Sequence, residues 1–110
     1  MYSDSVTFLM KDSFGRIGVT IRKGDLIQLK SFKENKYMSN YISEKHGIKS
    51  ETWYTVEEII DNTNIERRFI SVFSKTTPNH LVFIPVTQIL KVKKNTLNSI
   101  GIFHPLPLIF

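Results

Sequence analysis

The chain of 110 residues contains no cysteine. This absence excludes disulfides, thiolate metal sites and cysteine nucleophiles. Long apolar runs are also missing, because no stretch reaches the roughly 20 apolar residues that a membrane helix requires. The first residues lack the basic segment followed by a long apolar segment that defines a signal peptide. We therefore predict a cytoplasmic protein without a membrane partner.

Catalytic motifs are absent as well. The sequence has no glycine-rich phosphate loop, no G-x-S-x-G motif and no G-x-G-x-x-G motif. His46, His80 and His104 lie far apart in the sequence without local ligand spacing, so we predict no metal site and no cofactor. Glu57 and Glu58 are neighbours in a predicted strand and point to opposite faces, so they do not form one carboxylate pair. These absences predict that the protein is not an enzyme.

The sequence does contain enough apolar residues for one packed core. Hydrophobic residues make up 41% of the chain, and they include eight Phe, four Tyr and one Trp. Disordered chains lack such a content, and a chain of this length forms one domain. We predict a single domain over residues 1–98, followed by an apolar C-terminal tail over residues 99–110.

Alternating residues predict a fold built mainly of β-strands. Residues 16–22, RIGVTIR, place every second side chain on an apolar face, which is the period of a half-buried strand. The run at 6–10 is predicted to pair with it across a turn at KDSFG. Further strands are predicted at residues 26–30, 66–74, 80–86 and 88–94. The predicted core residues are Ile17, Val19, Ile21, Ile27, Leu29, Val56, Ile70, Val72, Val82, Ile84, Leu90 and Val92.

One segment has a helical period instead. Five residues recur at three- and four-residue spacing and form one stripe of a helix. Asn35 can cap its start, and Gly47 can take the left-handed conformation after its end. We predict a short helix between residues 35 and 47, with its Tyr and Met side chains in the core. The residues of the stripe are Tyr37, Met38, Tyr41, Ile42 and Lys45.

Residues 53–60, WYTVEEII, allow two interpretations. Thr55 and Glu58 match the capping box of a helix, whereas most of the segment is β-branched or aromatic and favours a strand. The turn residues 61–64, DNTN, would end a helix within two turns. A hairpin with the strand at 66–74 explains more of the segment, so we predict a strand. Arg67 or Arg68 is the expected cross-strand partner of one of the two glutamates.

The order of these features resembles the SH3-like barrels, including the KOW-type and related small bacterial and phage barrels. KGDLIQLKS opens the pattern, WYTVEEI follows after a long insertion, ERRFISVF returns and FIPVTQILKV closes it. In that family a G-D-x-[VIL]-x-[VIL] strand precedes a tryptophan-bearing strand, and a single turn containing proline precedes the last strand. The resemblance covers about residues 22–94. It implies a small SH3-like barrel, here with an inserted helix and an N-terminal hairpin.

The net charge of +5 is unevenly distributed. Residues 51–66 hold five of the ten acidic residues and no Lys or Arg, so the remainder carries all 15 basic residues. Such a basic body attracts polyanions, chiefly nucleic acid, although a solvated surface is the ordinary alternative. We predict an accessory or regulatory protein that binds DNA or RNA by its phosphates, with two tyrosines stacking on bases if they are exposed. The predicted contacts are Arg16, Arg22, Lys23, Lys30, Lys91, Lys93, Lys94, Tyr37 and Tyr41.

The apolar tail supports a rival hypothesis. Chain ends are usually polar, so this much apolar surface needs cover from the domain itself, from a second copy or from another protein. The rival is a protein-interaction module, for example a viral or mobile-element factor that docks on a host enzyme. The predicted interface residues are Ile102, Phe103, Leu106, Leu108 and Phe110. A third alternative is an SH3-like endoribonuclease toxin, but the chain lacks the Arg-Pro followed by apolar residues that such toxins carry.

Overall fold

A computed structural model of the protein describes residues 2–12, 14–62 and 67–95. In this part the chain is mainly β, as predicted, and its strands form three small antiparallel sheets. In chain order the elements are β1 (Ser5–Asp12), β2 (Gly15–Arg22), β3 (Leu26–Leu29), the helix η1 (Tyr37–Lys45), β4 (Tyr54–Thr55), β5 (Ile59–Asn62), β6 (Arg67–Phe73), β7 (Leu81–Pro85), the 3-10 turn η3 (Val86–Gln88) and β8 (Ile89–Lys93).

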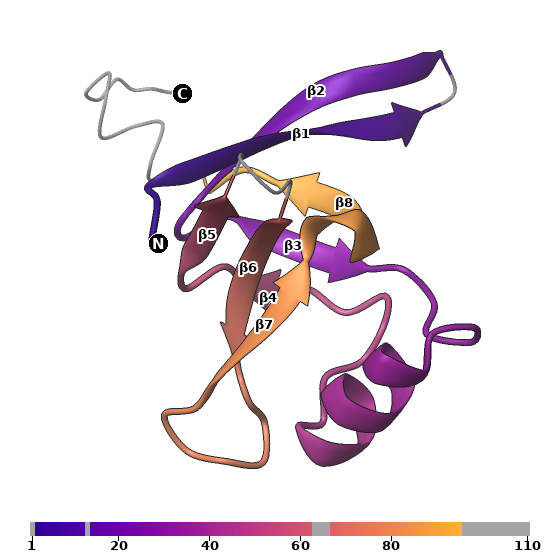
Figure 1. Ribbon diagram of the computed structural model, residues 1–110, viewed down its shortest axis with the longest axis vertical. Helices are drawn as coiled ribbons and strands as arrows, with labels where there is room; N and C mark the ends of the chain where they lie inside the picture. Colours follow the sequence, from indigo (N-terminus) through magenta and orange to yellow (C-terminus); the bar gives the residue numbers. More distant parts are fainter. Residues whose placement is uncertain (1, 13, 63–66, 96–110) are drawn as a thin grey trace, which may run out of the picture.

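Strands β1 and β2 form a hairpin, called the arm from here on, which lies across one side of the body (Figure 1). Its register pairs Phe8 with Val19 and Lys11 with Arg16, and it ends at the pair of Asp12 and Gly15. Gly15 has a φ of 119°, a conformation that suits glycine. The predicted turn at KDSFG is therefore shorter than expected, because Lys11 belongs to the strand.

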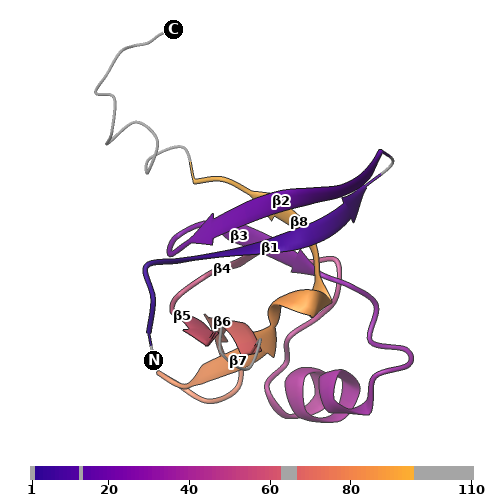
Figure 2. The same ribbon diagram turned by 45° about the horizontal axis from the view of Figure 1, so that its top comes forward.

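The other six strands form two sheets. β3 lies between β4 and β8, and β6 lies between β5 and β7. Figure 2 shows the arm on the side of β3 and β8, with β5, β6 and β7 on the opposite side. The described strands are not hydrogen-bonded into one closed barrel, so the barrel part of the fold prediction is not confirmed.

The segment from Tyr54 to Asn62 contributes one strand to each of these two sheets. Its partner changes in the middle: the Val56 N–H donates to the Asp25 carbonyl, and the next N–H, of Glu57, donates to the Ser71 carbonyl, each at 2.8 Å. A strand that passes from one sheet to another makes a corner between them. The prediction of a strand rather than a helix at residues 53–60 is confirmed, with the difference that the corner divides it into β4 and β5.

The core lies between the sheet of β3, β4 and β8 and the sheet of β5, β6 and β7, and the arm and η1 cover it. Most predicted core residues are buried in it, and Val19 and Val92 are partly buried against it. The confirmed buried residues are Ile21, Ile27, Leu29, Val56, Ile70, Val72, Val82 and Ile84.

Two core predictions are wrong. Ile17 is 46% exposed because it lies toward the tip of the arm, although it shares a face with the buried Ile21. Leu90 is 40% exposed because the register shifts there: Leu29 pairs with Ile89 and Gln28 pairs with Lys91, which leaves Leu90 as the extra residue of a β-bulge. Ile89 takes the buried position instead.

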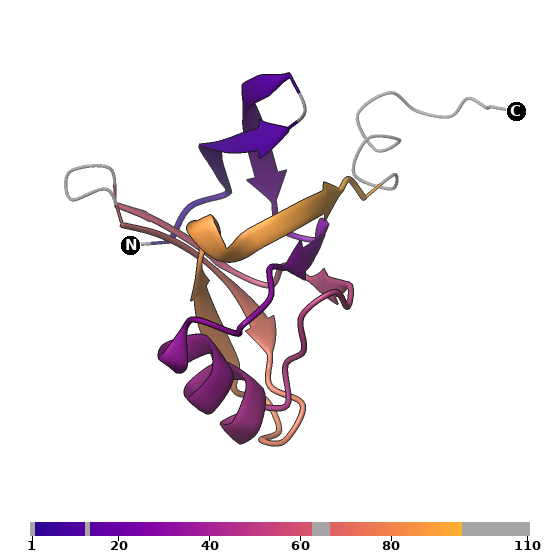
Figure 3. The ribbon, with the colours of Figure 1, turned by 90° about the vertical axis from the view of Figure 1, so that its right-hand side faces the viewer.

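The inserted helix is present as predicted, at the end of the body away from the arm (Figure 3). It is a π-helix, and the Asn35 side chain just before its start accepts a hydrogen bond of 3.1 Å from the Met38 N–H. Gly47 follows its end with a φ of 70°. Met38 and Ile42 are buried, which confirms the expected core contact of the methionine, whereas Tyr37 is about half exposed.

No helix in the described ranges is long and apolar enough to cross a membrane. The predicted tail lies outside the described residues, and so do the five interface residues assigned to it, which remain predictions: Ile102, Phe103, Leu106, Leu108 and Phe110.

Candidate nucleic-acid interface

Two adjoining hollows lie where the arm meets η3. The first hollow has a volume of about 310 Å³ and lies between β1, β2, Lys30 and the start of β8. The second hollow has a volume of about 420 Å³ and lies between β1, β6 and the end of β7. Both are lined by Phe8 and Leu9 from the arm and by Val86 and Thr87 from η3. The two hollows are therefore neighbours that share one wall.

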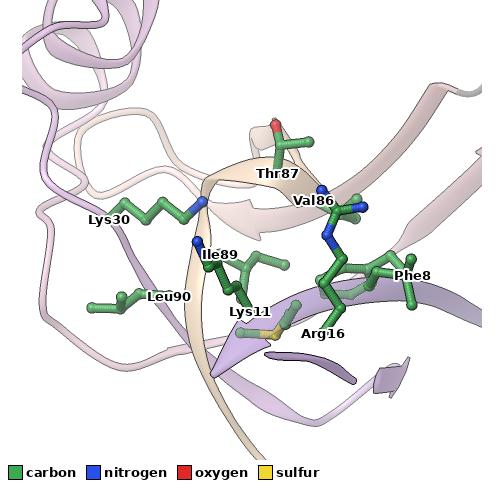
Figure 4. A pocket seen from close by; sticks show the side chains of 10 residues that line it. Phe8, Lys11, Arg16, Lys30, Val86, Thr87, Ile89 and Leu90 are labelled. Atoms are coloured by element: carbon green, nitrogen blue, oxygen red, sulfur yellow. The ribbon is translucent and has the colours of Figure 1, made fainter. Parts of the chain in front are cut away.

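Five basic side chains line these hollows. Lys11, Arg16 and Lys30 line the first, and Arg67 and Arg68 line the second. Figure 4 shows the charged ends of Lys11, Arg16 and Lys30 turned toward η3, around Thr87. No Asp or Glu is among the described residues that line either hollow. The hollows thus have an apolar floor and a cationic rim.

Pairings in the backbone fix the positions of these cations. Lys11 and Arg16 are directly opposite one another in the arm, and like charges in that position repel. Lys30 follows β3 and is held beside η3 because its N–H donates to the Gln88 carbonyl at 2.9 Å. Arg68 is opposite Asp61 and forms an ion pair with it at 3.3 Å. The other four described rim cations have no ion pair with a described acidic residue.

Arg16 and Lys30 are the predicted contact residues that line the first hollow. Lys91 and Lys93 are exposed on β8, across from Gln28 and Leu26, and Arg22 is exposed at the base of the arm. None of these three is among the described lining residues. Their role in binding remains a prediction, and the structure does not gather them with Arg16.

Lys94 is held by a buried carboxylate. Its Nζ lies 2.6 Å from Oδ2 of Asp25 and donates to the Thr20 carbonyl at 2.7 Å. Asp25 also accepts hydrogen bonds from the backbone N–H groups of Arg22 and Asn95, at 2.9 and 3.0 Å. Burial alone would raise the pKa of Asp25, but these hydrogen bonds and the Lys94 charge outweigh it and hold the pKa below 3.8. The structure thus gives Lys94 a role in stability.

Lys23 is also paired. Its Nζ lies 3.0 Å from Oε1 of Glu58, and this hydrogen bond and charge raise the pKa of Lys23 above its usual value. The prediction that Arg67 or Arg68 pairs with one of the two glutamates is therefore wrong for Glu58. The register explains why: Arg68 lies opposite Asp61, which is the acid that it binds.

Tyr37 and Tyr41 belong to a row of four rings rather than to the hollows. Tyr37 stacks on Tyr41 with centroids 5.3 Å apart, and the Tyr41 and His46 rings form a T-shaped pair with centroids 4.9 Å apart. His46 in turn stacks on His80 at 4.8 Å. Stacking of these tyrosines on bases remains a prediction, and neither lines a hollow. The two histidines are far apart in sequence but adjacent in space, although no group of three metal-ligating residues occurs among the described side chains.

Sequence reasoning missed Lys11, Arg67 and Arg68 as part of this surface. The position of Lys11 follows from the register of the arm, in which Asp12 pairs with Gly15 and Lys11 therefore lies opposite Arg16. The signal for the arginines was weaker, since their position beside η3 depends on contacts between distant segments. Comparisons with family models, curated proteins and solved structures find no match for the chain.

Proposed function

We propose that the protein is a non-enzymatic, cytoplasmic accessory or regulatory protein that binds nucleic acid at the two hollows. The observation that carries this proposal is the rim of five basic side chains without an acidic side chain among the described lining residues. Lys and Arg bind backbone phosphates independently of sequence, and they give an affinity that falls as salt rises.

The pair of Lys11 and Arg16 supports the proposal further. Two cations directly opposite one another in a hairpin destabilise it. A phosphate between them replaces this repulsion with two attractions, so the anion stabilises the arm as it binds.

We also propose that the body is SH3-like in its strand order. In support, β3 pairs with both β4 and β8, one run crosses from β4 to β5, and η3 directly precedes the last described strand. This is the order that the sequence resemblance implies. In this interpretation the arm is an addition to the barrel, and the hollows lie at the junction between the two.

Fluorescence anisotropy over rising salt tests the binding function, with labelled DNA and RNA titrated side by side. We expect binding at low salt with a linear decrease in log affinity against log salt. The double variant Lys11→Gln/Arg16→Gln should lower the slope by about 1.4 to 1.8, because each lost phosphate contact removes roughly 0.7 to 0.9 from it. Its affinity at low salt should fall by about tenfold or more.

The matched control is Lys33→Gln/Lys36→Gln, which removes the same charge from two exposed residues outside the hollows. It should keep a slope close to that of the wild type. Absence of binding at the lowest salt would refute the proposed function, and equal losses in the two double variants would refute the assignment to the hollows.

A protein-docking function is the second candidate. Its structural support is the tip of the arm, where Phe14 is 95% exposed close to the exposed Ile17. The predicted tail interface, including a homodimer formed through it, belongs to the same hypothesis. A pull-down from lysate with and without nuclease separates the two functions. Partners lost on nuclease treatment favour nucleic acid, and partners retained favour direct docking.

A further inference from the structure

We infer that the two hollows bind a single strand of nucleic acid and that Leu9 lies between two of its neighbouring bases. This inference rests on the proposed function and names the form of its ligand. It is carried by the position of Leu9, by the apolar floor of the hollows and by the arrangement of their cations.

Leu9 stands in the shared wall. Leu9 is 64% exposed, and it is a lining residue of both hollows. Its cross-strand partner is Gly18, which has no side chain to cover it. A Cβ built at Gly18 meets no heavy atom within 4 Å, so the space on that side of Leu9 is open. The leucine therefore projects as an apolar wedge with room on both sides.

The floor of the hollows fits the faces of bases. Phe8, Met10 and Leu90 contribute apolar surface to the first hollow, and Phe69 and Pro85 contribute it to the second. Volumes of about 310 and 420 Å³ fall in the range of small-ligand sites. A duplex hides its base faces within the stack, whereas a single strand can turn them outward onto apolar side chains. A site for duplex phosphates alone has no need of such a floor.

The cations lie on both sides of the wedge. Lys11, Arg16 and Lys30 belong to one hollow, and Arg67 and Arg68 belong to the other. A strand with one base in each hollow would therefore have basic residues beside the phosphates before and after the separated step. Apolar wedges such as leucine are known to enter between bases, at a cost in unstacking. That cost is smaller in a single strand, which is already partly unstacked, so the geometry favours the single-stranded form.

The test uses a single-stranded DNA oligonucleotide with two adjacent 2-aminopurines, whose fluorescence rises when they are unstacked. The variant is Leu9→Ser, and the control is Ile17→Ser. Ile17 is 46% exposed on the other strand of the arm and is not among the described lining residues. Circular dichroism melting confirms that both variants fold, which is expected because neither side chain is in the core.

We expect the wild type and Ile17→Ser to raise the fluorescence on binding and to prefer the single strand to the matching duplex. Leu9→Ser should bind the single strand about tenfold more weakly, as expected when the burial of one leucine side chain is lost, and should give no fluorescence rise. Its salt dependence should match that of the wild type, because no charge has changed.

The outcomes distinguish the inference from the proposed function. If the wild type binds neither form at low salt, the proposed function fails, and this inference fails with it. If the wild type binds both forms equally and Leu9→Ser behaves like Ile17→Ser, the protein still binds nucleic acid, but the single-strand inference is overturned.

Discussion

Asp25 is a single side chain that joins the turn after β2 to the residues that follow β8. Its buried carboxylate binds Lys94 and the backbone N–H groups of Arg22 and Asn95. We expect Asp25→Asn to lower the free energy of unfolding by about 2 kcal/mol, the value of a hydrogen bond to a charged group. Urea unfolding at pH 7 measures the loss. The matched control is Glu34→Gln, an exposed residue at which the same chemical change should have little effect.

The Asp25 carboxylate also predicts that the stability of the protein depends on pH in the acid range. Because its folded pKa is held below 3.8, Asp25 contributes stability above about pH 3.8, and this contribution is lost as the pH falls through the folded pKa. The difference in stability between the wild type and Asp25→Asn should therefore be full at pH 5 and should shrink toward pH 2. A difference that stays constant over that range would contradict the assigned role of the charge.

Gly15 and Gly18 allow a comparison within one strand. A Cβ meets no heavy atom within 4 Å at either position, but only Gly15 has a positive φ, of 119°. We expect Gly18→Ala to raise the free energy of unfolding by about 0.5 to 1 kcal/mol, because glycine loses more freedom on folding. Gly15→Ala should lower it by about 1 kcal/mol or more. Thermal melts of both variants measure the two changes in stability. Changes of the same sign in the two variants would contradict the prediction.

At the scale of elements, η1 is fastened to the loop that follows β6. The Lys75 N–H donates to the His46 carbonyl at 2.8 Å, and the Thr76 hydroxyl donates to the Lys45 carbonyl at 2.7 Å. Nδ1 of His46 lies 2.9 Å from the Ser74 hydroxyl, and its ring stacks on His80. His46 is therefore the centre of the contact between helix and loop.

This contact predicts that the folded protein loses stability as the pH falls below about 6.5. Burial lowers the pKa of His46 below 6.5, and the nearby His80 and Lys45 lower it further. As the pH falls below 6.5, His46 becomes protonated in the unfolded chain but stays neutral in the folded protein, where its ring is buried. Stability then decreases by at most about 1.4 kcal/mol per pH unit until the folded pKa is reached. We expect a lower urea midpoint at pH 5.5 than at pH 7.5.

The variants His46→Gln and His80→Asn identify the origin of this loss. His46→Gln should reduce the difference between the two pH values, whatever its effect on absolute stability. His80→Asn should reduce it in part, because the neighbouring charge that lowers the pKa of His46 is removed. A pH difference that persists unchanged in both variants would assign the effect to other groups.

The elements themselves were largely predictable from the sequence. Alternation located the strands, and the three- and four-residue spacing located η1, because both patterns are local. Leu90 could not be placed, since its exposure depends on a bulge against Gln28 and Leu29, far away in the chain. Ile17 fits the alternation of a strand, but it is exposed rather than buried. The alternation of residues does not reveal how far the arm extends beyond the body.

At the scale of the whole molecule, the described core is made by residues between Val6 and Ile89. If the tail is an interface, as the rival hypothesis predicts, deletion of residues 99–110 should leave the melting temperature unchanged. A decrease of several degrees would mean that the tail completes the core. Sedimentation of both forms tests the predicted tail interface in the same experiment. A dimer that becomes a monomer on deletion would support a homodimer formed through the tail. An unchanged oligomeric state would argue against such a homodimer.

The candidate site was predictable only as an excess of positive charge. Arg16 and Lys30 were named from the sequence, but their meeting with Lys11 and Arg67 around η3 requires the tertiary arrangement of several elements. Lys94 has an ion pair that the charge pattern of the sequence did not reveal. It belongs to a basic cluster in the sequence, yet the packing places it against Asp25.

The position of β8 has a consequence for synthesis of the protein on the ribosome. The arm and the hairpins of β5, β6 and β7 join neighbouring segments, so they can form as the chain emerges. β3 must wait much longer, because one of its two partners is the last described strand. Until then Ile27 and Leu29 have no cover from β8, and one edge of β3 is open to other nascent chains. We expect translation products that stop before Ile89 to aggregate, which makes slow translation of the codons for β8 a hazard for folding.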